Sequence, residues 1–167
     1  MDTLHSSEAL IENREALIEN NAAHKRVLLA DDQPAMLAQI ERVLGKTYDI
    51  VGSVGDGLCL LESAARLDPD VIVTDITMPG IDGFGAARSL KRAGCRSRLV
   101  FLTVHEDPDF AREAMSLGAD AYVVKSRLAS DLLTALHAAL AGRKFVSPTV
   151  GQPTRPTRCS SKTDESE

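Results

Sequence analysis

The amino-acid sequence predicts an α/β fold, a doubly wound five-stranded parallel sheet covered by helices on both faces. Two observations support this prediction. Short apolar runs alternate five times with segments of helical period along the middle of the chain. Several of these runs are continuous rather than alternating, as in strands buried on both faces. Five consecutive βα units form an open three-layer sandwich whose functional crevice lies outside the carboxyl ends of the strands.

The five predicted strands are rich in valine, isoleucine and leucine, which pack well on a buried, pleated surface. Because right-handed crossovers join the strands of such a sheet, we expect all five to run in the same direction. The strands are predicted at RVLLA (26–30), YDIVGSV (48–54), VIVTD (71–75), RLVFLTV (98–104) and AYVVK (121–125).

A segment in which apolar residues repeat at helical spacing follows each predicted strand. In the first segment, Met36, Ile40 and Val43 belong to a core-facing stripe. The second is expected to end near Asp68-Pro69, because the residue before proline resists the helical region. Glycine, which supplies a left-handed turn at low steric cost, follows each of the last three. The helices are predicted near 36–44, 58–68, 84–93, 108–118 and 128–141.

The composition argues against several classes of function. The formal net charge of −5 argues against a broad surface for nucleic acid or an anionic membrane. There is no N-terminal segment of the secretory type and no apolar stretch long enough to span a bilayer. Three widely spaced cysteines without a CxxC pair indicate free thiols in a reducing compartment rather than a metal or redox site. We therefore expect a cytoplasmic protein without a direct nucleic-acid or membrane partner.

The predicted domain spans residues 25–147 and leaves residues 1–24 as an N-terminal extension. Within this extension, EALIENR is followed by EALIEN (8–20), a seven-residue period with apolar residues on one narrow stripe. Fewer than two full heptads are present, which is too short to predict a coiled coil. The extension is interpreted either as a marginal helix on the surface or as a dimerising or docking helix.

The C-terminal segment 148–167 is rich in serine, threonine and proline and has no apolar period, which predicts a disordered tail. An effector domain of the usual size would not fit into this segment. We therefore expect the output to be a contact with another protein rather than direct control of transcription.

Polar or charged side chains lie at the ends of four of the five predicted strands. The set comprises Asp31, Asp32, Asp75, Thr103 and Lys125. Taken singly, each has a simple explanation, because aspartate caps helices and turns, threonine suits strands and a terminal lysine is often solvated. Because the carboxyl ends of parallel strands meet at one edge of the sheet, we expect all five side chains to lie close together.

Three carboxylates at one place repel one another unless a cation lies among them. Their oxygen atoms suit Mg²⁺, and no histidine or cysteine cluster supports zinc. Lys125 and the Thr103 hydroxyl could hold phosphoryl oxygens. Asp75 would then be equipped for nucleophilic attack on phosphorus, which gives an acyl phosphate.

The chain resembles the receiver domains (CheY-like) of two-component response regulators from about residue 26 to residue 148. The resemblance rests on Asp31-Asp32 after VLLA, Asp75 in VIVTDITMPGIDG, Thr103 in VFLTVHED and Lys125 in AYVVKS. The segment GRKFVSP is similar to the receiver ends of NarL/FixJ-type regulators, whose DNA-binding domain we do not expect here. The resemblance implies the flavodoxin-like (βα)5 fold.

By this resemblance, Asp75 accepts a phosphoryl group from a phosphohistidine on a sensor histidine kinase or a phosphotransfer protein. Mg²⁺ is the implied cofactor. Asp32 is implied to bind the ion directly and Asp31 more through water. Thr77 would complete the protein's share of the metal shell with its backbone carbonyl.

Thr103 and Lys125 are implied to bind the phosphoryl group, and Tyr122 occupies the position of the family's switch aromatic. The added charge would draw Thr103 toward the phosphoryl group and give Tyr122 space to turn. This movement would reshape the surface of the fourth helix, the fifth strand and the fifth helix. We expect a downstream protein to bind this surface, and we expect at least weak self-association as a homodimer.

Two positions depart from the family pattern. Val104 is bulkier than the small residue that often follows the threonine, so it could narrow access to Asp75. Ser126 stands where a proline is often joined by a cis bond, a form that costs about 2.5–4 kcal/mol without proline. Thr77 and His105 occupy the two positions implied to tune dephosphorylation.

Two other interpretations stay open. A receiver could act without phosphorylation as an adaptor or dimerisation module, although this sequence keeps every acid of the site. A haloacid-dehalogenase-like phosphatase also uses a strand-end aspartate with Mg²⁺. That chemistry needs a second acid two residues after the nucleophile, where this chain has Thr77. We therefore expect a protein that is not an enzyme.

Overall fold

The computed structural model describes residues 25–151, and a six-stranded parallel sheet forms its centre. The strand order is β2-β1-β3-β4-β5-β6, so the direction of winding reverses beside β1, as in a doubly wound sheet. The N-terminal repeat and the tail after residue 151 lie outside the described residues. The strands are β1 (Arg26–Ala30), β2 (Asp49–Val54), β3 (Val71–Thr74), β4 (Arg98–Thr103), β5 (Ala121–Val124) and β6 (Phe145–Val146).

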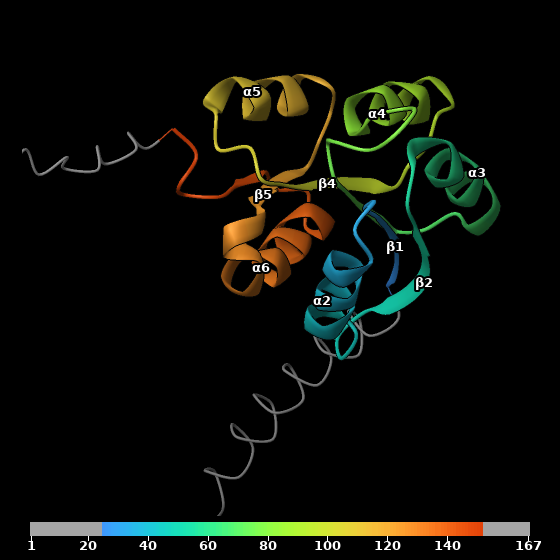
Figure 1. The fold of residues 1–167 in the computed structure, drawn as a ribbon, viewed down its shortest axis with the longest axis horizontal. Coiled ribbons are helices and arrows are strands. Elements are labelled where there is room, and N and C mark those ends of the chain that lie inside the picture. Colours follow the sequence, from blue (N-terminus) through green and yellow to red (C-terminus); the bar gives the residue numbers. More distant parts are fainter. Residues whose placement is uncertain (1–24, 152–167) are drawn as a thin grey trace, which may run out of the picture.

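The helices form two layers, one on each face of the sheet (Figure 1). One face is covered by α2 (Pro34–Leu44) and α6 (Leu128–Leu140), the other by α3 (Gly57–Leu67), α4 (Gly83–Arg92) and α5 (Pro108–Ser116). A 3₁₀ turn, η1 (Lys125–Arg127), joins β5 to α6. The predicted doubly wound α/β fold is confirmed. No helix among residues 25–151 is long and apolar enough to cross a membrane.

Each face of the sheet has its own apolar core. Because successive strand residues point to opposite faces, the neighbours Phe101 and Leu102 of β4 belong to different clusters. Phe101 packs edge-to-face on Phe84 of α4, with 5.3 Å between the ring centroids. Leu102 lies in the cluster that contains Leu132 and Leu136 of α6. The continuous apolar runs in the sequence therefore correspond to strands buried on both faces.

Short polar signals determine where several helices begin and end. Asp56 precedes α3, and its side chain accepts a hydrogen bond from the Cys59 N–H at 2.7 Å. Asp82 caps α4 in the same way. These bonds satisfy backbone donors that the first turn of a helix leaves without partners. At the other end of α3, Asp68 adopts a left-handed conformation before Pro69, near the predicted end of the helix.

The sixth strand was not predicted from the sequence. β6 pairs with the outer edge of β5, opposite Ala121 and Tyr122. A strand of two residues is too short to carry a periodic pattern in the sequence. These residues form a strand because the edge of β5 offers them unpaired backbone groups. Beyond β6, the Gly151 N–H donates to the Glu106 carbonyl at 3.3 Å. Residues 145–146 thus cover the β5 edge of the surface expected to bind partners.

Candidate functional site

Three aspartates meet at the carboxyl ends of β1 and β3, as the strand order requires. Asp31 and Asp32 directly follow β1, and Asp75 directly follows β3. Carboxylate oxygens of the three residues lie within 4.8 Å of one another. Asp31 and Asp75 are buried, with 1% and 6% of their surface exposed, whereas Asp32 is exposed. The acidic cluster therefore reaches solvent through Asp32.

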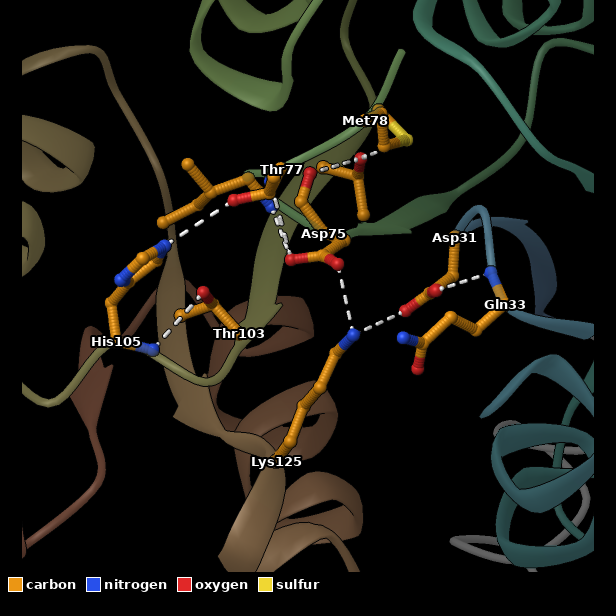
Figure 2. A network of polar contacts seen from close by, with 10 residues as sticks. Asp31, Gln33, Asp75, Thr77, Met78, Thr103, His105 and Lys125 are labelled. Atoms are coloured by element: carbon orange, nitrogen blue, oxygen red, sulfur yellow. Dashed lines mark hydrogen bonds and ion pairs between the residues drawn. The ribbon is translucent and has the colours of Figure 1, made fainter. Parts of the chain in front are cut away.

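Lys125 lies between the two buried aspartates (Figure 2). Its Nζ is 2.7 Å from Asp31 Oδ2 and 2.9 Å from Asp75 Oδ2. The lysine follows β5, and β4 separates β5 from β3 in the sheet, so its side chain connects carboxylates from two other strands. A buried ammonium in this position compensates part of the negative charge of the cluster.

The backbone holds the other oxygen of each buried aspartate. Asp31 Oδ1 accepts a hydrogen bond from the Gln33 N–H at 2.9 Å, and Asp75 Oδ1 accepts one from the Ile76 N–H at 2.7 Å. Each carboxylate thus has one oxygen on the backbone and one on Lys125. Both groups are oriented before any ligand binds, which lowers the cost of assembling a reactive geometry.

Burial and charge shift the pKa values in the cluster in opposite senses. Burial raises the pKa of Asp31, and the hydrogen bond from Lys125 opposes this only in part. Burial alone would lower the pKa of Lys125, but its bonds to Asp31 and Asp75 outweigh this and raise it. The lysine is therefore charged at neutral pH, whereas ionisation of Asp31 reduces the stability of the fold.

Thr103 lies near the cluster (Figure 2), but its hydroxyl, like that of Tyr122, bonds to the backbone of His105. Thr103 is buried at the end of β4, and its Oγ1 accepts from the His105 N–H at 3.3 Å. Tyr122 is buried in β5, and its hydroxyl donates to the His105 carbonyl at 2.7 Å. Burial raises the pKa of Tyr122, so this hydroxyl stays protonated. Both residues predicted to switch therefore share one peptide segment as their partner.

The His105 side chain makes contacts that no sequence pattern signals. Its ring stacks on Phe110 of α5, with 4.3 Å between the ring centroids. Its Nε2 lies 3.3 Å from the Thr77 hydroxyl (Figure 2). The sequence placed Thr77 and His105 only as two separate positions near the site. In the structure, this pair links the loop after β3 to the start of α5.

The two departures from the family pattern have definite places in the structure. Val104 is 66% exposed, so the bulk expected to narrow access to Asp75 lies largely in solvent. No peptide bond within residues 25–151 is cis, and the bond before Ser126 is therefore trans. The predicted metal ligand Thr77 lies two residues after Asp75 in the same loop.

Gly83 is a residue of the site that the sequence reasoning missed. It is the first residue of α4, and its N–H donates to the Ile76 carbonyl at 2.7 Å. A Cβ at this position would lie 2.2 Å from the backbone oxygen of Asp75. Helix α4 can therefore approach the segment that carries Asp75 only without a side chain here. The only signal of this role in the sequence is the glycine itself, because a residue of higher helix propensity would otherwise be expected at the start of a helix.

Comparison with known proteins gives one family. The model of the response regulator receiver domain matches residues 27–137. The nitrate/nitrite response regulator protein NarL of Escherichia coli (strain K12) is 33% identical over 130 residues, which are 77% of this chain and 60% of NarL. The chain thus spans three fifths of the length of this curated relative.

Solved structures agree with this result. The isolated receiver domain of RcsB from Salmonella enterica serovar Typhimurium, in the presence of the phosphomimetic BeF3−, is 30% identical with a TM-score of 0.71. That alignment covers 76% of this chain and 96% of the RcsB domain. A structure of two RcsB dimers bound to two parallel DNAs gives the same TM-score and identity, and covers 76% of this chain and 65% of the RcsB chain.

Proposed function

Because the chain belongs to the response regulator receiver domain family, we propose that Asp75 accepts a phosphoryl group from a phosphohistidine on a sensor histidine kinase or phosphotransfer protein. The supporting observation is the setting of this carboxylate, which is buried among acids and held 2.9 Å from Lys125 Nζ. Acidic neighbours are unfavourable for an aspartate that only stabilises the fold. They are useful where a cation and a phosphoryl group are to be bound.

The transfer forms a bond between a carboxylate oxygen of Asp75 and phosphorus. The bond from phosphorus to the donor's imidazole nitrogen breaks, and its electron pair leaves with the imidazole, which takes up a proton. Lys125 presents its positive charge to the oxygens of the transferred group. Thr103 can donate its hydroxyl proton to one of the same oxygens. The chain thus supplies orientation and positive charge, and the donor protein supplies the phosphoryl group.

The acidic cluster fits a hard divalent cation, because it offers oxygen atoms from three carboxylates within 4.8 Å. Asp32 and Asp75 would bind Mg²⁺ directly, Asp31 through water and Thr77 through its backbone carbonyl. When bound, Mg²⁺ would neutralise negative charge between the carboxylates and the phosphoryl oxygens.

The switch is proposed to act through the His105 backbone. A phosphoryl group on Asp75 adds roughly −1.5 to −2 charges and strong acceptors, which attract the Thr103 hydroxyl. Rotation of Thr103 releases the His105 N–H, and the Tyr122 hydroxyl is bound to the carbonyl of that same residue. The movement thereby reaches the surface of α5, β5 and α6, where we place a downstream protein partner.

Intact mass spectrometry after incubation with acetyl phosphate and Mg²⁺ tests this function. We expect one phosphate adduct on the wild-type protein and none on Asp75→Asn, because the amide is not a nucleophile for phosphorus. Omission of Mg²⁺ should also abolish the adduct. Asp109→Asn, which neutralises an exposed aspartate of α5, is the matched control and should be phosphorylated like wild type. An equal adduct on Asp75→Asn and wild type would refute the assignment.

Self-association through the surface of α5, β5 and α6 is also proposed, since RcsB, which has a similar receiver, forms dimers. Sedimentation velocity should show a sedimentation coefficient that rises weakly with protein concentration. Addition of BeF3− and Mg²⁺ should strengthen the increase, because the mimic favours the phosphorylated arrangement. A monomer mass that is independent of concentration in both conditions would contradict this proposal.

A further inference from the structure

Asp131 is a buried aspartate that takes no part in the acidic cluster. Asp131 of α6 is 5% exposed. Arg127 binds it with two nitrogens, Nε at 2.7 Å from Oδ2 and Nη2 at 3.1 Å from Oδ1. The Ser147 hydroxyl donates to Oδ2 at 2.8 Å. These bonds, that from Arg127 first, lower the pKa of Asp131, so the group is ionised at neutral pH.

Ser147 connects this aspartate to the end of β5. The serine is 1% exposed, and its Oγ accepts a hydrogen bond from the Val124 N–H at 3.1 Å. Its own N–H donates to the Tyr122 carbonyl at 2.9 Å. β6 ends one residue earlier, at Val146, so the serine hydroxyl takes the place of a strand carbonyl for the last residue of β5. The hydroxyl therefore uses both its acceptor and its donor capacity.

The two contacts lie on either side of Lys125. Val124 precedes the lysine and is bound by Ser147, and Arg127 follows it by two residues and is bound by Asp131. Ser147 thus holds the backbone N–H before Lys125, and Asp131 holds both the Ser147 hydroxyl and the side chain of Arg127 after it. A lysine side chain is long and flexible, and its ammonium reaches one place reproducibly only if its own backbone is fixed.

We infer that Ser147 and Asp131 are positioning residues. Ser147 holds the backbone before Lys125 and Asp131 holds Ser147 in place, so that the lysine ammonium meets the two buried aspartates and the phosphoryl group. Neither side chain belongs to the acidic cluster, so the effect passes through Lys125. The inference deepens the proposed function, on which its phosphorylation arm rests.

The phosphorylation arm compares Ser147→Ala with wild type in the acetyl phosphate reaction. We expect the initial rate of adduct formation to fall about tenfold, since small displacements in a reactive geometry have effects of this order. In a Lys125→Ala background the same substitution should have no further effect, because the residue being positioned is absent. Ser116→Ala removes an exposed hydroxyl that bonds to its own helix and should leave the rate unchanged. An equal factor in both backgrounds would show a merely structural role and overturn the inference.

A second readout does not depend on phosphorylation. The ¹⁵N resonance of the Lys125 ammonium, assigned by its absence in Lys125→Ala, should move or broaden in Ser147→Ala. Ser147→Thr keeps the hydroxyl and should give the wild-type Lys125 resonance, and Ser116→Ala should also leave this resonance unchanged. An unchanged resonance in Ser147→Ala would overturn the inference. If wild type forms no adduct, the proposed function fails, and this resonance alone decides the positioning role.

Asp131→Asn serves as a second variant if Ser147→Ala does not fold. The amide is nearly isosteric and keeps one acceptor oxygen, but it loses the charge that binds Arg127. We expect the same change in the Lys125 resonance and a smaller fall in the phosphorylation rate. A folded Asp131→Asn protein with wild-type values of both would contradict the role of this pair.

Discussion

Replacement of Lys125 by alanine is expected to lower the free energy of unfolding of the metal-free protein by about 3–5 kcal/mol at neutral pH. The lysine side chain is 8% exposed and lies 2.7 and 2.9 Å from two buried carboxylates. Removal of the ammonium leaves Asp31 and Asp75 buried next to each other without their shared cation. Loss of one partner from a buried ion pair is among the most destabilising of single substitutions.

The loss of stability caused by Lys125→Ala should depend on pH. Asp31 has a raised pKa in the folded protein, so the folded state binds its proton more tightly than the unfolded state does. The stability gained from that proton is complete below the unfolded pKa and disappears as the pH rises through the folded pKa. Lys125→Ala removes contacts that lower the pKa of Asp31, so the pKa rises further. The deficit of the variant should therefore be largest near neutrality and shrink as the pH falls toward about 4.

Urea unfolding in the presence of EDTA, at about pH 7 and about pH 5, measures both effects. Lys144→Ala is the control, since this lysine also faces a carboxylate, Asp120 at 3.5 Å, but is 58% exposed. Because this lysine is exposed to solvent and Asp120 also pairs with Arg98, its removal should cost about 0–1 kcal/mol. Two results would contradict the role of Lys125 as the shared cation of Asp31 and Asp75. One is an equal loss of unfolding free energy in both variants, and the other is a loss in Lys125→Ala that grows as the pH falls.

Gly83→Ala is expected to destabilise the protein by about 3 kcal/mol or more, at the upper end of what overpacking produces. The added Cβ would lie 2.2 Å from the Asp75 carbonyl oxygen and 2.7 Å from the Ile76 Cα. Both neighbours are backbone atoms, so no side chain can turn away to make room. Either α4 moves outward or the segment that carries Asp75 shifts, and the second change would also displace the Asp75 carboxylate from Lys125.

Gly55→Ala is the matched control for this substitution. A Cβ at Gly55 would find its nearest neighbour, the Asp31 carbonyl oxygen, at 3.9 Å, an ordinary contact distance. The free energy of unfolding of Gly55→Ala, measured by urea titration, should stay within about 0.5 kcal/mol of the wild-type value. A Gly83→Ala protein as stable as the Gly55→Ala protein would show that α4 does not press against the site as described.

The sequence by itself determined the fold class and brought together most residues of the candidate site. Apolar runs of strand length and helical stripes depend on local periodicity, which is readable without tertiary contacts. Asp31, Asp75 and Lys125 could be grouped for a topological reason, because parallel strands in one sheet must deliver their carboxyl ends to the same edge. Their meeting required only the element order, and the ion pairs of Lys125 agree with it.

Only the tertiary structure decided the contacts that depend on packing between distant segments. β6 exists because the edge of β5 is open, and Ser147 meets Asp131 because β6 ends beside α6. The bonds of Thr103 and Tyr122 to His105, and the close approach of Gly83 to Asp75, likewise join residues that share no periodic pattern. Local sequence specifies which residues form an element. The direction and partners of a side chain are set by the atoms that surround it, and these are assembled only when the sheet and its two helical layers close together.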